Sequence, residues 1–117
     1  MASNRIGRIS GDMQIVISDV MRDLKDPRIT GMLSIVRVDV TNDLSYATVY
    51  VSSMDGLDAA KEAVKGLTHA GGFIKREIGS RLKMRKIPEL RFVPDTSIAQ
   101  GAEMAKRIKQ LNEDDED

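Results

Sequence analysis

HAGGFIKREIGSRLKMRK, residues 69–86, combines the spacing of an amphipathic helix with two features that a buried helix does not need. Gly71 and Gly72 interrupt the helical pattern, and each weakens a helix by roughly 1 kcal/mol relative to alanine. Four cations then follow within six residues: Arg81, Lys83, Arg85 and Lys86. Because like charges this close repel one another, the stretch predicts two helices joined at a glycine bend, with a positively charged surface beyond it.

The patterns on either side of this stretch predict one α+β domain. Apolar residues recur every three or four positions over 6–24, 57–69 and 74–82, which predicts three helices. Alternating residues predict strands over 34–40, 45–52 and 89–93, the first two joined by the polar turn 41–44. Pro27 and Pro88 end the first and third helical segments. The order is α-β-β-α-α-β, followed by a short C-terminal helix over 98–111, so the domain is expected to span residues 1–111.

Three strands with helices packed on one face accommodate this order. In the first strand, the alternation predicts Val36, Val38 and Val40 on the core side, opposite Ile35, Arg37 and Asp39. The uncovered face of the sheet would then carry Arg37, Tyr46, Thr48 and Tyr50. The two tyrosines could form a stacking platform for unpaired bases, or they could simply cover the sheet.

The formal net charge of zero conceals an uneven distribution of charge along the chain. Residues 65–91 hold eight Lys and Arg but only Glu77 and Glu89, whereas Glu113–Asp117 supply five of the eighteen acids. We expect residues 112–117 to form a disordered acidic tail, either solvated or folded back on the basic surface in competition with its ligand. The chain has no cysteine, and no apolar run approaches the roughly 20 residues of a membrane span. These features favour a cytoplasmic protein without disulfides.

The residues that catalysis requires are sparse. His69 is the only histidine and has no cysteine to partner it, so we interpret it as a loop or helix-end residue. The glycines match neither a Walker loop nor a dinucleotide fingerprint, and no serine lies in a GxSxG pattern. The sequence therefore predicts no enzyme, no cofactor and no metal site.

The basic stretch is better explained as an anion-binding surface. Arg76 and Lys83, seven residues apart, would share one helix face, and Gly79 and Ser80 between them would leave a low centre that a phosphate backbone could approach. Such contacts give affinity through counterion release and carry little base information. The alternative is a solvated helix face, but Glu77 is the only acid on this one.

The glycine pair allows two interpretations. Gly71 or Gly72 could end the preceding helix in the left-handed region. Alternatively, the two helices meet almost without a loop, as in type II KH domains, which clamp nucleic-acid backbone with a GxxG turn. This chain has Ala70-Gly71-Gly72 in place of that turn.

The chain resembles the ribosome-binding factor A family, whose KH-like domain carries Ala-x-Gly at this bend. The resemblance covers residues 5 to about 111 and rests on four segments in order: LKDPRI, VDVTNDLSYATVYVS, AGGFIKREIGSRLKMRKIPELRFVPD and DTSIAQGAEMAKRIKQL. It implies a type II KH-like fold and a non-catalytic assembly factor. Such a factor would bind the immature 30S subunit and its 16S rRNA, near the 5′ terminal helix and the neck, late in maturation. The resemblance also implies cytoplasmic action, cold adaptation and a functional link to a ribosome-associated GTPase.

Carried onto this chain, the resemblance implies RNA contacts at the basic stretch. The bend would be Ala70, Gly71 and Gly72, and the best phosphate contacts Arg76, Arg81, Lys83, Arg85 and Lys86, with Lys75, Arg5, Arg8 and Arg28 as further candidates. Without GxxG, we expect recognition of folded RNA shape rather than of four unpaired nucleotides, and we expect a monomer. The competing hypothesis is a protein-interaction module whose basic face meets an acidic partner.

Overall fold

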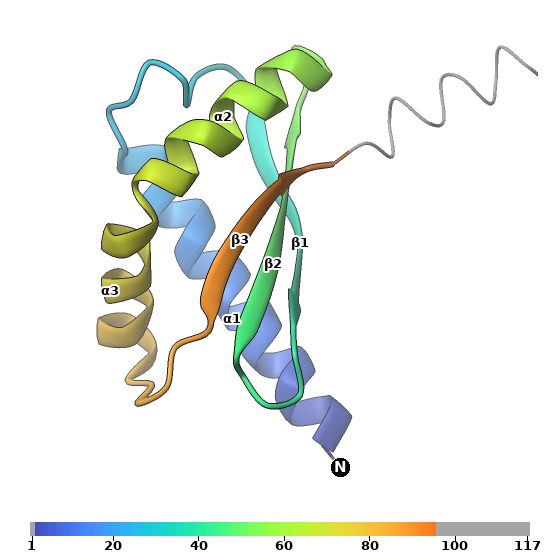
Figure 1. Ribbon diagram of the computed structural model, residues 1–117, viewed down its shortest axis with the longest axis vertical. Helices are drawn as coiled ribbons and strands as arrows, with labels where there is room; N and C mark the ends of the chain where they lie inside the picture. Colours follow the sequence, from blue (N-terminus) through green and yellow to red (C-terminus); the bar gives the residue numbers. More distant parts are fainter. Residues whose placement is uncertain (1, 96–117) are drawn as a thin grey trace, which may run out of the picture.

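The elements of the computed structural model, which describes residues 2–95, follow the predicted order (Figure 1). They are α1 (Ala2–Asp23), β1 (Leu33–Val40), β2 (Tyr46–Ser53), α2 (Leu57–His69), α3 (Gly71–Leu82) and β3 (Glu89–Pro94). The α+β class is therefore confirmed. The C-terminal helix expected over 98–111 and the acidic tail expected over 112–117 lie outside the described residues.

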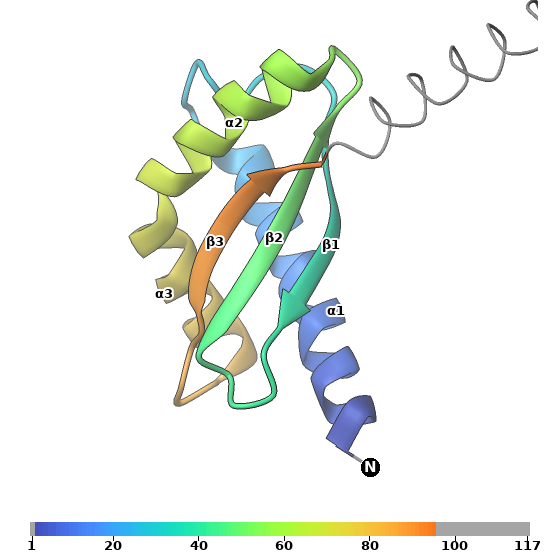
Figure 2. The same ribbon diagram turned by 45° about the vertical axis from the view of Figure 1, so that its right-hand side comes forward.

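The three strands form one sheet in the order β1-β2-β3. β1 and β2 pair antiparallel across the turn at residues 41–45, whereas β3 pairs parallel to β2. A parallel neighbour requires a crossover connection, and α2 with α3 supplies it. Among the described residues, the three helices cover one side of the sheet and leave the other side bare (Figures 1 and 2), as the sequence predicts.

The core lies between the sheet and the helices. β2 alternates as predicted, with Ala47, Val49 and Val51 fully buried against the helices. Each large apolar side chain buried in this way stabilises the fold by about 1.5–3 kcal/mol. The hydrophobic side chains with no exposed surface are Met13, Ile17, Ala47, Val49, Val51, Ala63, Leu67, Ile74 and Ile78.

In β1 the predicted alternation is wrong in the first half of the strand. The register shifts between Ile35, which pairs with Val51, and Arg37, which pairs with Tyr50, so Val36 is an extra residue in a β-bulge. Val36 is consequently 45% exposed, whereas Ile35 turns into the core at 5%. Beyond the bulge the prediction is correct: Val38 is buried and Arg37 faces outward with Tyr50.

Candidate nucleic-acid interface

The bend between α2 and α3 contains a single residue outside either helix. Ala70 has φ −86° and ψ 6°, its N–H donates to the Gly66 carbonyl at 3.1 Å, and its own carbonyl accepts from the Ile74 N–H at 3.0 Å. Gly71 and Gly72 are the first residues of α3 and have no positive φ. The interpretation that one of them is left-handed is therefore wrong, because Ala70 alone makes the turn.

The outer side of the bend is open. A Cβ added to Gly71 or Gly72 would meet no atom within 4 Å. No side chain of the described residues caps the start of α3, and its first turn has no acidic residue. Helix starts present unpaired backbone N–H groups and a partial positive charge, so the bend can accept an anion from the outside.

α3 is amphipathic, but its low centre is not where the sequence places it. Ile74 and Ile78 are fully buried on the inner face, and Arg76 is exposed on the outer face. Gly79, however, is covered by Ile87: a Cβ at Gly79 would lie 2.5 Å from Ile87 Cδ1. Because Gly79 has no side chain, Ile87 packs directly against the helix at this position. The low centre expected there for a phosphate backbone is therefore not formed.

Lys83 ends α3 in the left-handed region, with φ 52° and ψ 42°. The prediction that Arg76 and Lys83 share one helix face is therefore wrong, because the helix ends at Leu82. Glycine is the usual residue at such a helix end, since a Cβ there costs roughly 1 kcal/mol. A lysine in this position therefore costs stability, and its side chain is exposed.

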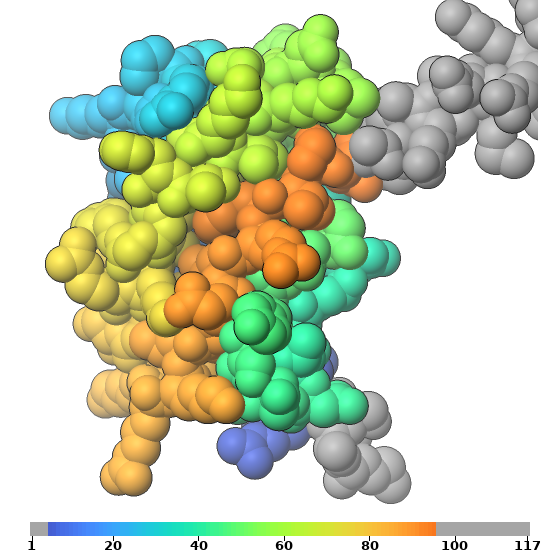
Figure 3. Space-filling view, in the orientation of Figure 1, coloured from blue at the N-terminus to red at the C-terminus, as the bar shows by residue number. Residues whose placement is uncertain are grey.

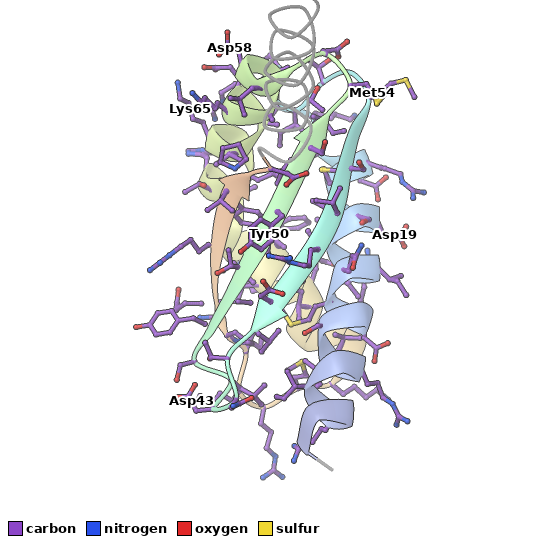
Figure 4. All side chains as sticks on the ribbon, turned by 90° about the vertical axis from the view of Figure 1, so that its right-hand side faces the viewer. Asp19, Asp43, Tyr50, Met54, Asp58 and Lys65 are labelled. Carbon is purple, nitrogen blue, oxygen red and sulfur yellow. The ribbon has the colours of Figure 1, made fainter. Side chains whose placement is uncertain are left out.

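The β1–β2 turn lies against both the loop after α3 and the start of α1. Lys86 Nζ donates to the Asp43 carbonyl oxygen at 3.0 Å, and a recess of about 250 Å³ lies between Arg5, Ile6, Asn42, Asp43 and Leu44. Figures 1 and 4 show these segments at the same end of the molecule, and Figure 4 labels Asp43 there. In the space-filling view the light-orange loop projects from this end (Figure 3).

This end, which we call the basic end, collects cations from segments far apart in the sequence. Its members are Arg5, Arg8, Lys83, Arg85 and Lys86. The acid of the β1–β2 turn is Asp43, whose carboxylate accepts hydrogen bonds from the Thr41 hydroxyl and the Ser45 N–H at 2.9 and 3.1 Å. Those bonds, chiefly the one from Thr41, lower the pKa of Asp43.

The predicted contact residues fall into two groups by their partners. Arg5, Arg8, Arg76, Lys83 and Arg85 are exposed and form no ion pair with any other residue that the structure describes. The others are engaged. Arg81 pairs with Glu77 at 3.1 Å and with Asp19 of α1 at 3.6 Å.

Lys75 and Arg28 each have a close carboxylate partner. Lys75 Nζ lies 2.7 Å from Glu89 Oε1. Arg28 binds Asp26 through two side-chain bonds of 3.0 and 2.8 Å, and these bonds, above all, lower the pKa of Asp26 from 3.8 to about 2. Arg28 is therefore engaged within the loop before β1.

The bare face of the sheet carries the predicted residues in a self-paired arrangement. The Arg37 guanidinium carbon lies 4.3 Å from the centroid of the Tyr50 ring, and its Nη2 lies 3.1 Å from Asp39 Oδ2. Figure 4 looks onto this face. Tyr50 is thus already covered, whereas Tyr46 is 54% exposed. The stacking-platform hypothesis now depends on Tyr46.

Other chemistry has little support among residues 2–95. No cluster of three or more potential ligands there could hold a metal ion, and no helix there has the length and apolar character of a membrane span. His69 is the last residue of α2, as expected of a helix-end residue. Among the contacts that sequence reasoning missed is Lys75 with Glu89, fourteen residues apart on different elements, for which the sequence offers no spacing signal.

Comparison with known proteins gives a consistent result. The family model described as ribosome-binding factor A matches residues 5–108. The protein of that name from Clostridioides difficile (strain 630) is 47% identical over 115 residues, covering 97% of this chain and 90% of the relative. The one from Clostridium novyi (strain NT) is 41% identical over 114 residues, covering 97% and 94%.

Solved structures agree with this result. The solution structure of a Thermotoga maritima protein described as a ribosome-binding factor A superposes with a TM-score of 0.71 at 31% identity, covering 80% of this chain and 89% of that one. A homology model of the Thermus thermophilus factor, fitted into a cryo-EM map of a 30S complex of that factor, gives 0.62 at 24% identity, covering 74% and 91%. Because the Thermus thermophilus homology model is only 24% identical to this chain, its similarity supports the fold alone.

Proposed function

Because this chain belongs to the ribosome-binding factor A family, we propose that it is an assembly factor that binds the immature 30S subunit through 16S rRNA and promotes its late maturation without catalysis. We place its binding near the 5′ terminal helix and the neck of the subunit, with release coupled to a ribosome-associated GTPase. We also propose that it acts in the cytoplasm, as a monomer, and supports growth in the cold.

The observation that carries this proposal is the set of exposed cations that have no carboxylate partner among residues 2–95. Arg76 on α3 and Lys83 and Arg85 beyond it lie on one continuous stretch of chain that leads from the open bend to the basic end. Lysine and arginine left unpaired by their own protein can neutralise phosphates, and the counterions released on binding supply affinity. Lys83 in particular occupies a backbone conformation that a glycine would adopt at less cost.

Bound in this way, the protein would act by selecting conformations of its partner. A ligand shifts an equilibrium only by its differential affinity for the states involved. A rigid basic surface that matches one arrangement of phosphates would favour the arrangement of rRNA that presents them. Phosphate contacts position a protein on RNA and carry no base information, so the proposal concerns recognition of folded shape.

The test reverses the charge at Arg76, Lys83 and Arg85 together, by substitution to glutamate, and measures association with immature 30S particles across a series of salt concentrations. Each lost phosphate contact should reduce the slope of log K against log salt by about 0.7–0.9. The matched control reverses Lys25, Lys61 and Lys65, which are also exposed. Lys65 is labelled at the opposite end of the molecule (Figure 4). An unchanged slope in the folded Arg76, Lys83 and Arg85 variant would refute the proposed surface.

The second candidate function is a protein-interaction module whose basic face meets an acidic partner. The same unpaired cations favour it. Digestion with RNase separates the two candidates, because RNA-dependent association should be lost when rRNA is cut. Comigration with the same large complex after complete digestion would favour the protein partner.

A further inference from the structure

A second recess runs along β3, from the start of the strand beside the β1–β2 turn toward the end of α2. It encloses about 390 Å³ and is lined by Tyr46, Thr68, Glu89, Leu90, Arg91 and Phe92. Thr68 stands two residues before the bend, so the recess opens close to the exposed start of α3. Arg91 is exposed and forms no ion pair within residues 2–95.

The recess contains the groups that an unpaired nucleotide would use. Tyr46, which is 54% exposed, supplies an aromatic ring, and Arg91 supplies a guanidinium group. Unpaired bases bind by stacking on such rings and guanidinium planes. A strand lying here would bring its phosphates toward the same residues. On these features alone, the recess would accept single-stranded RNA.

Glu89 opposes that use. Its side chain lines the recess and is 69% exposed, and its carboxylate forms the 2.7 Å ion pair with Lys75 of α3. Figures 1 and 2 both show α3 beside β3, so the pair joins the helix to the edge of the sheet. Glu89 holds a carboxylate where a strand's phosphates would pass, and its pairing with Lys75 takes that lysine out of the set of free cations.

We propose that Glu89 is a specificity-determining residue that excludes unpaired RNA from the β3 recess, so that the protein binds folded RNA. This inference rests on the proposed RNA-binding function. An unpaired strand must bring its phosphates within a few ångströms of the carboxylate, where screening by salt is weak. A duplex keeps its bases paired, stays outside the recess and meets only the cations of the outer surface.

Glu89→Gln tests the proposal, because it removes the charge and keeps the size of the side chain. The substitution also frees Lys75, which should strengthen binding of any RNA, so a matched control is required. Glu62→Gln provides it: Glu62 forms a similar exposed pair with Lys65, at 2.9 Å, on α2. The control frees one lysine without changing the recess.

The assay measures dissociation constants of the full chain by fluorescence anisotropy. The probes are a single-stranded oligoribonucleotide of about six nucleotides and a blunt RNA duplex of about 16 base pairs. We expect Glu89→Gln to tighten binding of the single strand about fivefold more than binding of the duplex. An effect of this size is what the removal of one nearby charge should produce. Glu62→Gln should change both by the same factor.

Lys75→Gln gives the opposite perturbation. It leaves the Glu89 carboxylate unneutralised in the recess, so we expect the single strand to bind more weakly relative to the duplex. Three results would overturn the proposal: equal gains for both probes in Glu89→Gln, no binding of either probe by that variant, or a wild-type chain that already prefers the single strand. The wild type's association with 30S particles, measured separately, reports on the proposed function itself.

Discussion

Substitution of Gly72 by alanine should stabilise the protein, although the sequence pattern suggests a position that only glycine tolerates. Gly72 is the second residue of α3, has no positive φ, and would carry its Cβ into open space. Alanine reduces the conformational freedom of the unfolded chain and is favoured in helices, by about 0.5–1 kcal/mol per site. For a domain of this size, that free energy corresponds to a rise in Tm of roughly 2–8 °C.

The matched control is Gly66→Ala in α2, a substitution of the same chemistry in a buried helical position. There the new Cβ would lie 2.8 Å from Ile29 Cγ1 and 3.2 Å from Asp26 Oδ2. The displacement of these neighbours should exceed the gain in helix propensity, because overpacking typically costs about 1–3 kcal/mol. We therefore expect Tm to rise for Gly72→Ala and to fall for Gly66→Ala.

Thermal unfolding followed by circular dichroism measures both variants, with denaturant titration giving the free energy of unfolding. A Tm that falls for Gly72→Ala would refute the helical conformation assigned to the bend glycines. The same variant also tests whether the bend glycines take part in RNA binding. If 30S association weakens while stability rises, the open side of the bend contacts RNA, because the added methyl group then obstructs binding without damaging the fold.

Three further predictions concern separate parts of the chain. Asp26, whose pKa is lowered to about 2 by Arg28, contributes stability that is present above its unfolded pKa of about 3.8 and is lost as the pH falls toward 2. Asp26→Asn should lower Tm near neutral pH and flatten its fall in acid; an unchanged acid transition would contradict the pairing. Ile78→Ala removes a fully buried side chain and should destabilise by about 2–5 kcal/mol in urea unfolding; a loss under half a kilocalorie would contradict that packing. Deleting Glu113–Asp117 should leave affinity for RNA at low salt unchanged if the tail is solvated, and an increase would show that the tail competes.

Most of the fold could be predicted because strong local patterns agree with the packing. The period of the α1 pattern and the alternation in β2 each place their apolar residues on the face that the structure buries. β1 breaks this agreement, since Val36 is as apolar as its neighbours and nothing in the sequence marks it as the bulged residue. The bulge is fixed by pairing with β2, which single-strand periodicity does not contain.

The sequence predicts which cations belong to the candidate site, but not how they are arranged or which of them are neutralised. The cluster of cations is visible in the sequence, but their neutralisation depends on residues brought close by the fold. Arg81 meets Asp19 of α1, and Lys75 meets Glu89 of β3. The role of Gly79 was likewise hidden, because only the folded chain brings Ile87 against it. The basic end arises from contacts between a turn, a loop and a helix start.

The mixed sheet sets the order in which the protein can assemble as it leaves the ribosome that synthesises it. β1 and β2 pair across a five-residue turn at 41–45, whereas β3 can join β2 only after residues 54–88 have been made and folded. Pairings across long intervals of chain form slowly because loop closure must precede the contacts. A nascent chain halted before residue 89 would therefore hold a two-stranded sheet with an unpaired β2 edge. That edge is a hazard for aggregation during translation, and β3 is the strand that covers it.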